Sequence, residues 1–291
     1  MKIGIHGKIF SEEIKPTIQL VFSELSKRSS TPLVSRAFHE ILKGHGADFG
    51  AYEIYENHLR PREVDAMFTL GGDGTLLEAV THIGASEIPI LGINTGRLGF
   101  LATTAKEDIP KAIEAIFDGA YAFDFRTLLH LDSDQGLFNG ANFALNDFTI
   151  LKKDSSSMIV VHTYLNGMFL NSYWADGIIV STPTGSTGYN LSCGGPLVLP
   201  QSNNFIITPV SPHSLTLRPM VVSDNSEISF QIEDRNKHFL VTLDSRHETV
   251  DANVKISVKK ESFEAKLIKL DNHNIFETMK QKLKWGMDAR N

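Results

Sequence analysis

The hydrophobic periodicity changes about 125 residues into this 291-residue chain, and this change limits the fold more than any other feature. Before it, short apolar runs alternate with segments whose apolar residues recur at helical spacing, as in α/β proteins. After it, alternation with a period of two prevails, as in Glu227–Glu233 and Lys255–Lys259. We therefore predict an α/β domain with an open parallel sheet over residues 1–125 and an all-β sandwich over residues 126–271.

Local signals add detail to this division. The pair Asn166–Gly167 lies between two strand-like runs and predicts a tight hairpin. Thr104 and Glu107 have the spacing of a capping box, and Gly119 can end the helix that follows them. Helical spacing returns near the end of the chain, so we predict a C-terminal helix within residues 272–291 that packs on the first domain.

The run Ala66–Leu70 reads as a buried strand, and it leads through Gly71–Thr75 directly into a helical pattern. Glycines allow a sharp turn, and the amides at a helix start point towards an anion, so this turn predicts a phosphate site. Asp73 would repel a bare phosphate, which indicates a proton acceptor or a partner of a phosphate-bound metal ion. The spacings of a Walker A loop and of the Gly-x-Gly-x-x-Gly fingerprint are absent. A plain turn capped by Asp73 is the alternative.

A loop rich in hydroxyl groups and glycine follows the apolar run Ile178–Val180. Hydroxyls and exposed amides can hold phosphate or ribose oxygens without adding charge, and Tyr189 can pack against a base or a sugar. A flexible polar loop is the alternative, since stretches of Ser, Thr and Gly commonly form one. Pro183 stiffens this loop and favours the binding site.

Two further segments carry candidate binding groups. Asn94–Leu101 follows a strand-like run and should share the carboxyl edge of the parallel sheet with Asp73, where ligands bind in open α/β folds. Its Arg97 can meet a phosphate, or it can be an ordinary solvated arginine. Asn146 and Asp147 interrupt an apolar run; amide and carboxylate together can bind ribose hydroxyls, and an edge strand or bulge is the alternative.

Composition restricts partners and location. Twenty-eight basic against 34 acidic residues give a net charge of -6, which argues against nucleic-acid binding. A single cysteine, Cys193, excludes a disulfide within the chain and favours a reducing compartment. The start of the chain lacks a signal-peptide pattern and no apolar run approaches the ~20 residues of a membrane span, so we expect a cytoplasmic protein without a membrane partner. The eleven histidines show no paired ligand spacing, so no histidine-based metal site is expected.

Together, these motifs resemble those of the NAD kinase family over about residues 65–245. The matching segments are Gly71–Thr75, Asn94–Leu101, Asn146–Asp147, Asp176–Tyr189, Gly194–Pro196, Ser211–Leu215 and Arg218–Pro219. The resemblance implies that the γ-phosphate of ATP is transferred to the 2′-hydroxyl of the adenosine ribose of NAD, giving NADP and ADP. It further implies a divalent cation with ATP, Mg²⁺ being the usual one, a homotetramer or homodimer, and a first domain similar to phosphofructokinases and diacylglycerol kinases.

The resemblance also implies roles for individual residues. Asp73 matches the general base that accepts the 2′-hydroxyl proton or orients that hydroxyl, and Gly74 lets the backbone approach the nucleotide. Asn146 and Asp147 match the pair that holds a ribose of NAD. The other implied NAD contacts are Phe100, Asp176, Ser186, Thr187, Gly188, Tyr189, Asn190, Leu191 and Ser192. Arg97 and Arg246 are candidate phosphate contacts.

The chain departs from the family pattern at three positions. Gly188 stands where alanine is common, Trp174 where a basic residue is frequent, and Arg246 where several members have glutamine. One hypothesis is that Arg246 supplies a positive charge that Trp174 does not.

Two other functions remain as alternatives at this stage. One is a lipid or other small-molecule kinase that uses the same Gly-Gly-Asp-Gly turn, although no exposed amphipathic helix suggests a membrane substrate. The other is a dinucleotide-binding sensor without turnover, which would have little use for the carboxylate of Asp73. The range of phosphoryl donors, the choice between NAD and NADH, and feedback by NADP(H) stay open.

Overall fold

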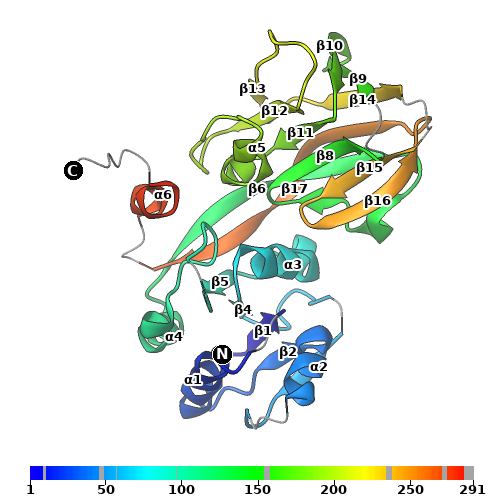
Figure 1. Ribbon diagram of the computed structural model, residues 1–291. Helices are drawn as coiled ribbons and strands as arrows, with labels where there is room; N and C mark the ends of the chain where they lie inside the picture. The colour runs from blue at the N-terminus through cyan, green and yellow to red at the C-terminus, as the bar shows by residue number, and fades with distance from the viewer. Residues whose placement is uncertain are drawn as a thin grey trace. The chain divides into compact units, whose positions relative to one another are not determined.

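The structure is a computed structural model, and it describes residues 1–8, 11–45, 49–56, 58–96, 98–153, 158–233, 238–270 and 274–284. The chain divides into two compact units (Figure 1). Unit 1 comprises Met1–Phe125 and Ala265–Asn291, and unit 2 comprises Arg126–Glu264. Unit 1 is thus assembled from two separate stretches of the chain, with the whole of unit 2 between them in sequence.

Unit 1 is an α/β fold around a parallel sheet. Its strands are β1 (Ile3–Gly7), β2 (Leu33–Ser35), β3 (Glu53–Tyr55), β4 (Ala66–Leu70) and β5 (Ile90–Ile93). Its helices are α1 (Lys15–Lys27), α2 (Arg36–Gly44), α3 (Asp73–Ile83), α4 (Ile109–Phe117) and α6 (Ile275–Leu283), with short 3₁₀ turns at Gly84–Ser86 and Lys106–Asp108. The strand order is β5-β4-β1-β2-β3 and every pair is parallel, which confirms the predicted sheet.

This strand order places a topological switch point between β1 and β4. The chain leaves β1 to build β2 and β3 on one side, and it later returns to build β4 and β5 on the other. In doubly wound sheets, ligands bind beyond the carboxyl ends of the strands at such a point. Every residue of β1 and β4 is buried, as expected for central parallel strands covered by helices on both faces.

The start of α4 differs from the sequence prediction. Thr104 does not cap this helix; instead it pairs with Ile93 in an isolated parallel bridge, and its carbonyl accepts a hydrogen bond from the Asn94 amide at 2.8 Å. The predicted capping box is therefore wrong, because strand-like pairing holds Thr104 in an extended conformation. The helix ends as predicted, since Gly119 has a left-handed φ of 71° and its amide bonds to the Ile116 carbonyl.

Unit 2 is built mainly of antiparallel strands. The strands are β6 (Ala122–Ser133), β7 (Phe143–Ala144), β8 (Asp147–Lys152), β9 (Ile159–Leu165), β10 (Met168–Ala175), β11 (Gly177–Ser181), β12 (Asn204–Val210), β13 (Met220–Ser223), β14 (Ile228–Glu233), β15 (His238–Leu243), β16 (Arg246–Asp251) and β17 (Ile256–Lys269). The first residues of β6 and the last of β17 belong to unit 1. Short helical segments occur at Leu137–Gly140, Thr184–Thr187 and, as α5, Tyr189–Ser192.

These strands form the predicted sandwich. One sheet has the order β13-β12-β11-β8-β15-β16, and β10, β9, β14 and β17 lie side by side in the other. Side chains from both sheets share one hydrophobic core, in which Phe148 of β8 stacks on Phe230 of β14 with 5.5 Å between ring centroids. The hairpin predicted at Asn166–Gly167 joins β9 to β10, and both residues have left-handed φ angles, as a two-residue turn of this kind requires.

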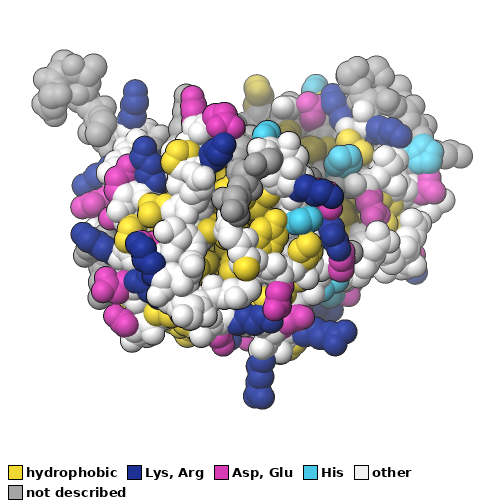
Figure 2. Space-filling view, turned by 90° about the horizontal axis from the view of Figure 1, so that it is seen from below, with side chains coloured by type: hydrophobic (Ala, Val, Ile, Leu, Met, Phe, Trp, Pro, Cys, Tyr) yellow, Lys and Arg dark blue, Asp and Glu magenta, His cyan; other side chains and the backbone are white. Residues whose placement is uncertain are grey.

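Charges are mixed on the surface that Figure 2 presents. Lys and Arg side chains lie among Asp and Glu side chains across this face, and neither sign dominates it. Within the described ranges, no helix has the length and apolar character needed to cross a membrane.

Candidate functional site

The turn between β4 and α3 has the geometry that its glycines predict. A Cβ atom on Gly71 would lie 2.2 Å from the Thr75 hydroxyl oxygen, so only glycine fits there. Gly72 is the N-cap of α3, and Asp73 is the first helical residue. The turn follows β4 at the switch point beside β1, and the carboxylate of Asp73 lies at the positive end of the helix dipole.

Asp73 also holds the loop that follows β5. Its Oδ2 accepts a hydrogen bond from the Phe100 amide at 2.8 Å, and its Oδ1 accepts bonds from the amides of Leu101 and Ala102, both at 3.0 Å. A Cβ atom on Gly99 would lie 1.9 Å from Oδ1, so this approach requires glycine. The expectation that Asp73 and the Asn94–Leu101 segment share one sheet edge is confirmed.

The other candidate residues of unit 1 lie around this carboxylate. The Cβ position of Gly74 has no neighbouring atom within 4 Å, so the start of α3 is open there. The half-buried ring of Phe100 has the ammonium of Lys282, from α6, 5.1 Å from its centroid. Arg97 lies outside the described residues.

In unit 2, the loop after β11 packs closely against the start of β8. The Thr182 amide donates to the Asn146 carbonyl at 2.9 Å, and the Thr182 hydroxyl donates to the Leu145 carbonyl at 2.6 Å. A Cβ atom on Gly185 would lie 2.0 Å from the Asn146 carbonyl oxygen, so glycine is required at this contact. The loop is therefore a defined structure built on β8, and the alternative of a flexible polar loop is wrong.

Polar groups from both segments meet at Gly188. A Cβ atom there would lie 3.7 Å from both Asn146 Nδ2 and Asp147 Oδ2. Tyr189, the next residue, is 40% exposed. Burial raises the pKa of the Tyr189 hydroxyl, and the charges of Asp147 and Asp176 add to the shift. The loop and the start of β8 thus bring together Gly188, the Asn146 amide, the Asp147 carboxylate and the Tyr189 ring.

Asp147 and Asp244 form a pair of interacting carboxylates. Burial, together with the nearby Asp244 charge, raises the pKa of Asp147 to about 7. Burial also raises the pKa of Asp244, whose oxygens accept bonds from the amides of Leu145 at 2.9 Å, Asn146 at 2.8 Å and Asp147 at 3.2 Å. Asp244 is therefore a positioning residue for Asn146 and Asp147. No role for Asp244 is evident in the sequence, since 98 residues separate it from Asn146 and no spacing rule connects them.

Two of the implied NAD contacts are occupied by partners within the protein. The Ser186 hydroxyl donates to the Val198 carbonyl at 3.0 Å and accepts from the Val198 amide at 3.1 Å. The buried Asn190 amide donates to the carbonyls of Ser186 and Pro196, and its oxygen accepts from the Thr208 hydroxyl at 2.6 Å. These bonds fix the shape of the loop, and direct contact of Ser186 or Asn190 with NAD stays a prediction.

The remaining candidates lie at the edges of this region. Thr187 and Leu191 are half-buried and Ser192 is exposed. The Asp176 carboxylate pairs with Lys152 Nζ at 2.6 Å. The Arg246 guanidinium donates to the carbonyls of Ala141 and Phe143 and lies 5.7 Å from two phenylalanine ring centroids. These contacts favour a structural role for Arg246, and its contact with phosphate stays a prediction.

Known proteins match this sequence along its whole length. Residues 3–121 match the family model described as ATP-NAD kinase N-terminal domain, and residues 145–270 match the ATP-NAD kinase C-terminal domain. The NAD kinase of Cytophaga hutchinsonii is 51% identical over 292 residues, covering all of both chains. The chain belongs to the NAD kinase family. The NAD kinase of one Bacteroides fragilis strain is 40% identical, again over the full length of both.

Solved structures of NAD and NADH kinases share the fold. A yeast NADH kinase complexed with NADH superposes with a TM-score of 0.85 at 23% identity, covering 99% of this chain and 89% of that one. An Archaeoglobus fulgidus NAD kinase in complex with ATP gives a TM-score of 0.74 at 24% identity, covering 98% and 99%.

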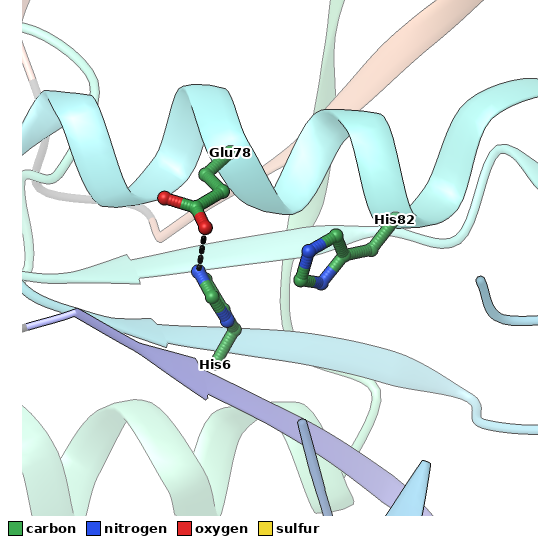
Figure 3. A group of neighbouring side chains, drawn as sticks. All are labelled: His6, Glu78 and His82. Carbon is green, nitrogen blue, oxygen red and sulfur yellow. Dashed lines mark ion pairs between the residues drawn. The ribbon is translucent and has the colours of Figure 1, made fainter. Parts of the chain in front are cut away.

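One group of side chains lies outside the NAD kinase motifs. His6, Glu78 and His82 come together in unit 1 (Figure 3), a grouping that the histidine spacing in the sequence did not indicate. Burial lowers the pKa of His6 to about 4, with the neighbouring His82 adding to the shift, and burial also lowers the pKa of His82. The signal that could have found this group is the four-residue spacing of Glu78 and His82, which places both on one helix face.

Proposed function

We propose that this enzyme transfers the γ-phosphoryl group of ATP to the 2′-hydroxyl of the adenosine ribose of NAD, giving NADP and ADP. Phosphorylation of NAD with ATP follows from membership of the NAD kinase family. One observation carries the assignment of the catalytic residue: the Asp73 carboxylate lies at the switch point of the sheet, on a turn whose helix start can meet phosphate.

In this proposal, Asp73 accepts the proton of the 2′-hydroxyl as its oxygen attacks the γ-phosphorus. A bond forms between the ribose oxygen and phosphorus, and the bond to the oxygen shared with the β-phosphate breaks, leaving ADP. A positioned base contributes typically 10²- to 10⁴-fold to such a step, and most of the remaining catalysis is placement and charge neutralisation. The amides of residues 100–102 would fix the orientation of the carboxylate.

The residues of unit 2 would bind NAD. Asn146 can donate to and Asp147 can accept from ribose hydroxyls, and Asp244 holds the backbone of both. Tyr189 is exposed enough to pack against a base or a sugar. The lining would be completed by Asp176, Thr187, Gly188, Leu191 and Ser192.

A divalent cation, Mg²⁺ in this proposal, would enter with ATP on its phosphate oxygens and neutralise their charge. Mg²⁺ prefers oxygen ligands and keeps much of its water, and the carboxylate of Asp73 is an oxygen donor that fits an ion of this kind. We also propose a homotetramer or homodimer, which light scattering of the purified protein would test. The cytoplasmic location expected from the single cysteine stays a prediction.

A coupled assay tests the reaction. Purified protein is mixed with ATP, Mg²⁺ and NAD, each is omitted in turn, and NADP is followed with an NADP-specific dehydrogenase. NADP should form only in the complete mixture. NAD binding without NADP would favour a sensor, and neither binding nor turnover would favour a kinase with another acceptor.

The variant Asp73→Asn tests the assigned role. We expect turnover to fall about 10²- to 10⁴-fold, because the amide cannot accept the proton, while calorimetry should show NAD binding within a few-fold of the original. Asp65→Asn is the matched control, since Asp65 is an exposed carboxylate of the same unit, and it accepts a hydrogen bond from the Lys2 amide at 2.7 Å. Unchanged turnover in Asp73→Asn would rule out this role for Asp73.

A further inference from the structure

His6, Glu78 and His82 form a compact group between β1 and α3, apart from the residues assigned to NAD and ATP. His6 is the penultimate residue of β1, and Glu78 and His82 are one helical turn apart on α3. One ligand atom from each residue lies within 4.8 Å of the other two (Figure 3). Two elements distant in sequence thus present two imidazoles and a carboxylate to one point.

His6 carries a buried atom without a hydrogen-bond partner. The residue is only 1% exposed, and its Nδ1 bonds the Ser35 hydroxyl at 2.8 Å. Its Nε2 is buried and makes no hydrogen bond; the Glu78 Oε1 lies 3.8 Å away. A buried polar atom without a partner reduces the free energy of unfolding by about 1–3 kcal/mol. Such atoms are rare in native folds, and a bound ligand is one reason for them.

The second histidine is oriented in the same way. His82 Nδ1 bonds the hydroxyl of buried Tyr55 at 2.9 Å, and its ring lies edge-on to that of His6 with 4.6 Å between centroids. When each Nδ1 donates to its hydroxyl, each Nε2 presents a lone pair. Hydrogen bonds that fix the tautomer through the other ring nitrogen are the usual surroundings of metal-binding histidines.

We propose that His6, Glu78 and His82 bind a divalent transition-metal ion, and that Zn²⁺ fits these ligands best. Two imidazoles and one carboxylate are a known zinc donor set that leaves a fourth position for water. Zinc bonds of about 2.0–2.1 Å place tetrahedral ligand atoms roughly 3.3–3.5 Å apart, so side-chain rotations that move these atoms by about 1 Å close the site. Lys8 bonds the other oxygen of Glu78 at 3.0 Å, which leaves Oε1 as the ligand atom.

A bound ion would join β1 to α3, the helix that begins at Asp73. The ion should therefore stabilise unit 1 whether or not nucleotide is present. This inference is independent of the proposed catalytic roles, because none of the three ligands is among the residues assigned to the reaction.

The test is a zinc titration of the full chain, freed of metal with a chelator and kept without nucleotide. Against a chromophoric competitor, we expect one Zn²⁺ per chain with micromolar or tighter affinity and a higher unfolding temperature. Co²⁺ in its place should give the visible absorption of a tetrahedral site. Glu78→Gln should weaken zinc binding at least tenfold; this side chain is 31% exposed, so folding should be retained.

Two more variants separate the site from general effects. Tyr55→Phe keeps all three ligands but removes the bond to His82, and it should weaken binding roughly tenfold. His130→Gln is the matched control: this imidazole of unit 2 also has carboxylates nearby, Glu261 at 2.6 Å and Asp132 at 3.2 Å, but both its nitrogens are hydrogen-bonded. It should leave zinc binding unchanged. Absence of zinc binding, binding unaffected by Glu78→Gln, or loss of the ion in His130→Gln would each overturn the proposal.

Discussion

Unit 1 and unit 2 each contain a carboxylate that accepts hydrogen bonds from three successive backbone amides. In unit 1, Asp73 binds the amides of Phe100–Ala102, and in unit 2, Asp244 binds those of Leu145–Asp147. Their surroundings differ. Asp73 begins a helix between two exposed glycines, whereas Asp244 lies in a left-handed turn between β15 and β16 and faces the carboxylate of Asp147.

In the proposed function, this difference separates a reacting group, Asp73, from a positioning group, Asp244. Asp73 has the positive end of a helix beside it and an open approach, so a substrate hydroxyl can reach it. Asp244 repels a neighbouring negative charge and holds the backbone of two proposed ribose-binding residues. A similar set of three hydrogen bonds therefore accompanies two different proposed roles. The neighbouring charges and the access of substrate to each carboxylate determine which role it has. Three predictions test this contrast.

Gly99→Ala should have the largest effect, because it displaces the carboxylate of Asp73. The new methyl group would overlap with Oδ1 at 1.9 Å, so the side chain must move. A shift of about 1 Å in a reacting group can cost 10²-fold, and we expect a turnover loss of at least that size. Gly96→Ala is the matched control in the same loop, since its Cβ position has no atom within 4 Å. Equal activity of both variants would contradict the prediction.

Asp244→Ala should destabilise the protein by about 3 kcal/mol, because three amides among buried residues such as Leu145 lose their acceptor. Asp73→Ala also frees the amides of buried Leu101 and Ala102, but the glycines on both sides of Asp73 are exposed and water can reach its position, so we expect a smaller cost of about 1–2 kcal/mol. Urea unfolding measures both values. Asp244→Gly controls for backbone strain at φ 53°, and it should remain clearly destabilised. Equal costs at Asp244 and Asp73 would remove the contrast.

Asp147→Asn should have the smallest effect, which is a change in how the free energy of unfolding depends on pH. Because the pKa of Asp147 is raised to about 7 in the folded protein, its contribution is fully present below about pH 4 and is lost as the pH rises through about 7. Asp147→Asn removes this loss. Its advantage over the original chain, measured by urea unfolding without nucleotide, should grow by roughly 2–3 kcal/mol from pH 5 to pH 8. A constant difference across this range would show that Asp147 does not titrate as described.

Much of the fold could be predicted because its signals are local. Alternating apolar residues, Asn166–Gly167 and the run from Ala66 to Thr75 each depend on neighbours within about ten residues, and the structure confirms the parallel sheet, the hairpin and the strand–turn–helix unit. The capping box at Thr104 failed because a distant partner, Ile93, decides the conformation of that residue. Local patterns cannot report such pairing.

The candidate site shows the same limit. The motifs around Asp73 and Asn146 could be found because glycine, carboxylate and amide have distinct roles at short spacing. The contact of Asp244 with Asn146 and that of His6 with Glu78 could not be found in this way, since strand order brings these residues together. The spacing of Glu78 and His82 is a local signal for the second group, but it does not point to His6. Parallel pairing of β1 with β4 places His6 beneath α3, and no periodicity in the sequence encodes that pairing.

The division of unit 1 into two stretches has a consequence for synthesis. At about 5–20 residues per second, a ribosome needs roughly seven to thirty seconds to produce Arg126–Glu264 after the first five parallel strands have been made. Throughout that interval, β5 lacks the neighbour that Leu267 of β17 later provides opposite Ile90. The edge of the sheet at β5 therefore stays unpaired while unit 2 is being synthesised. A chain whose synthesis stops within unit 2 would keep this edge exposed, and it could pair with other incomplete chains.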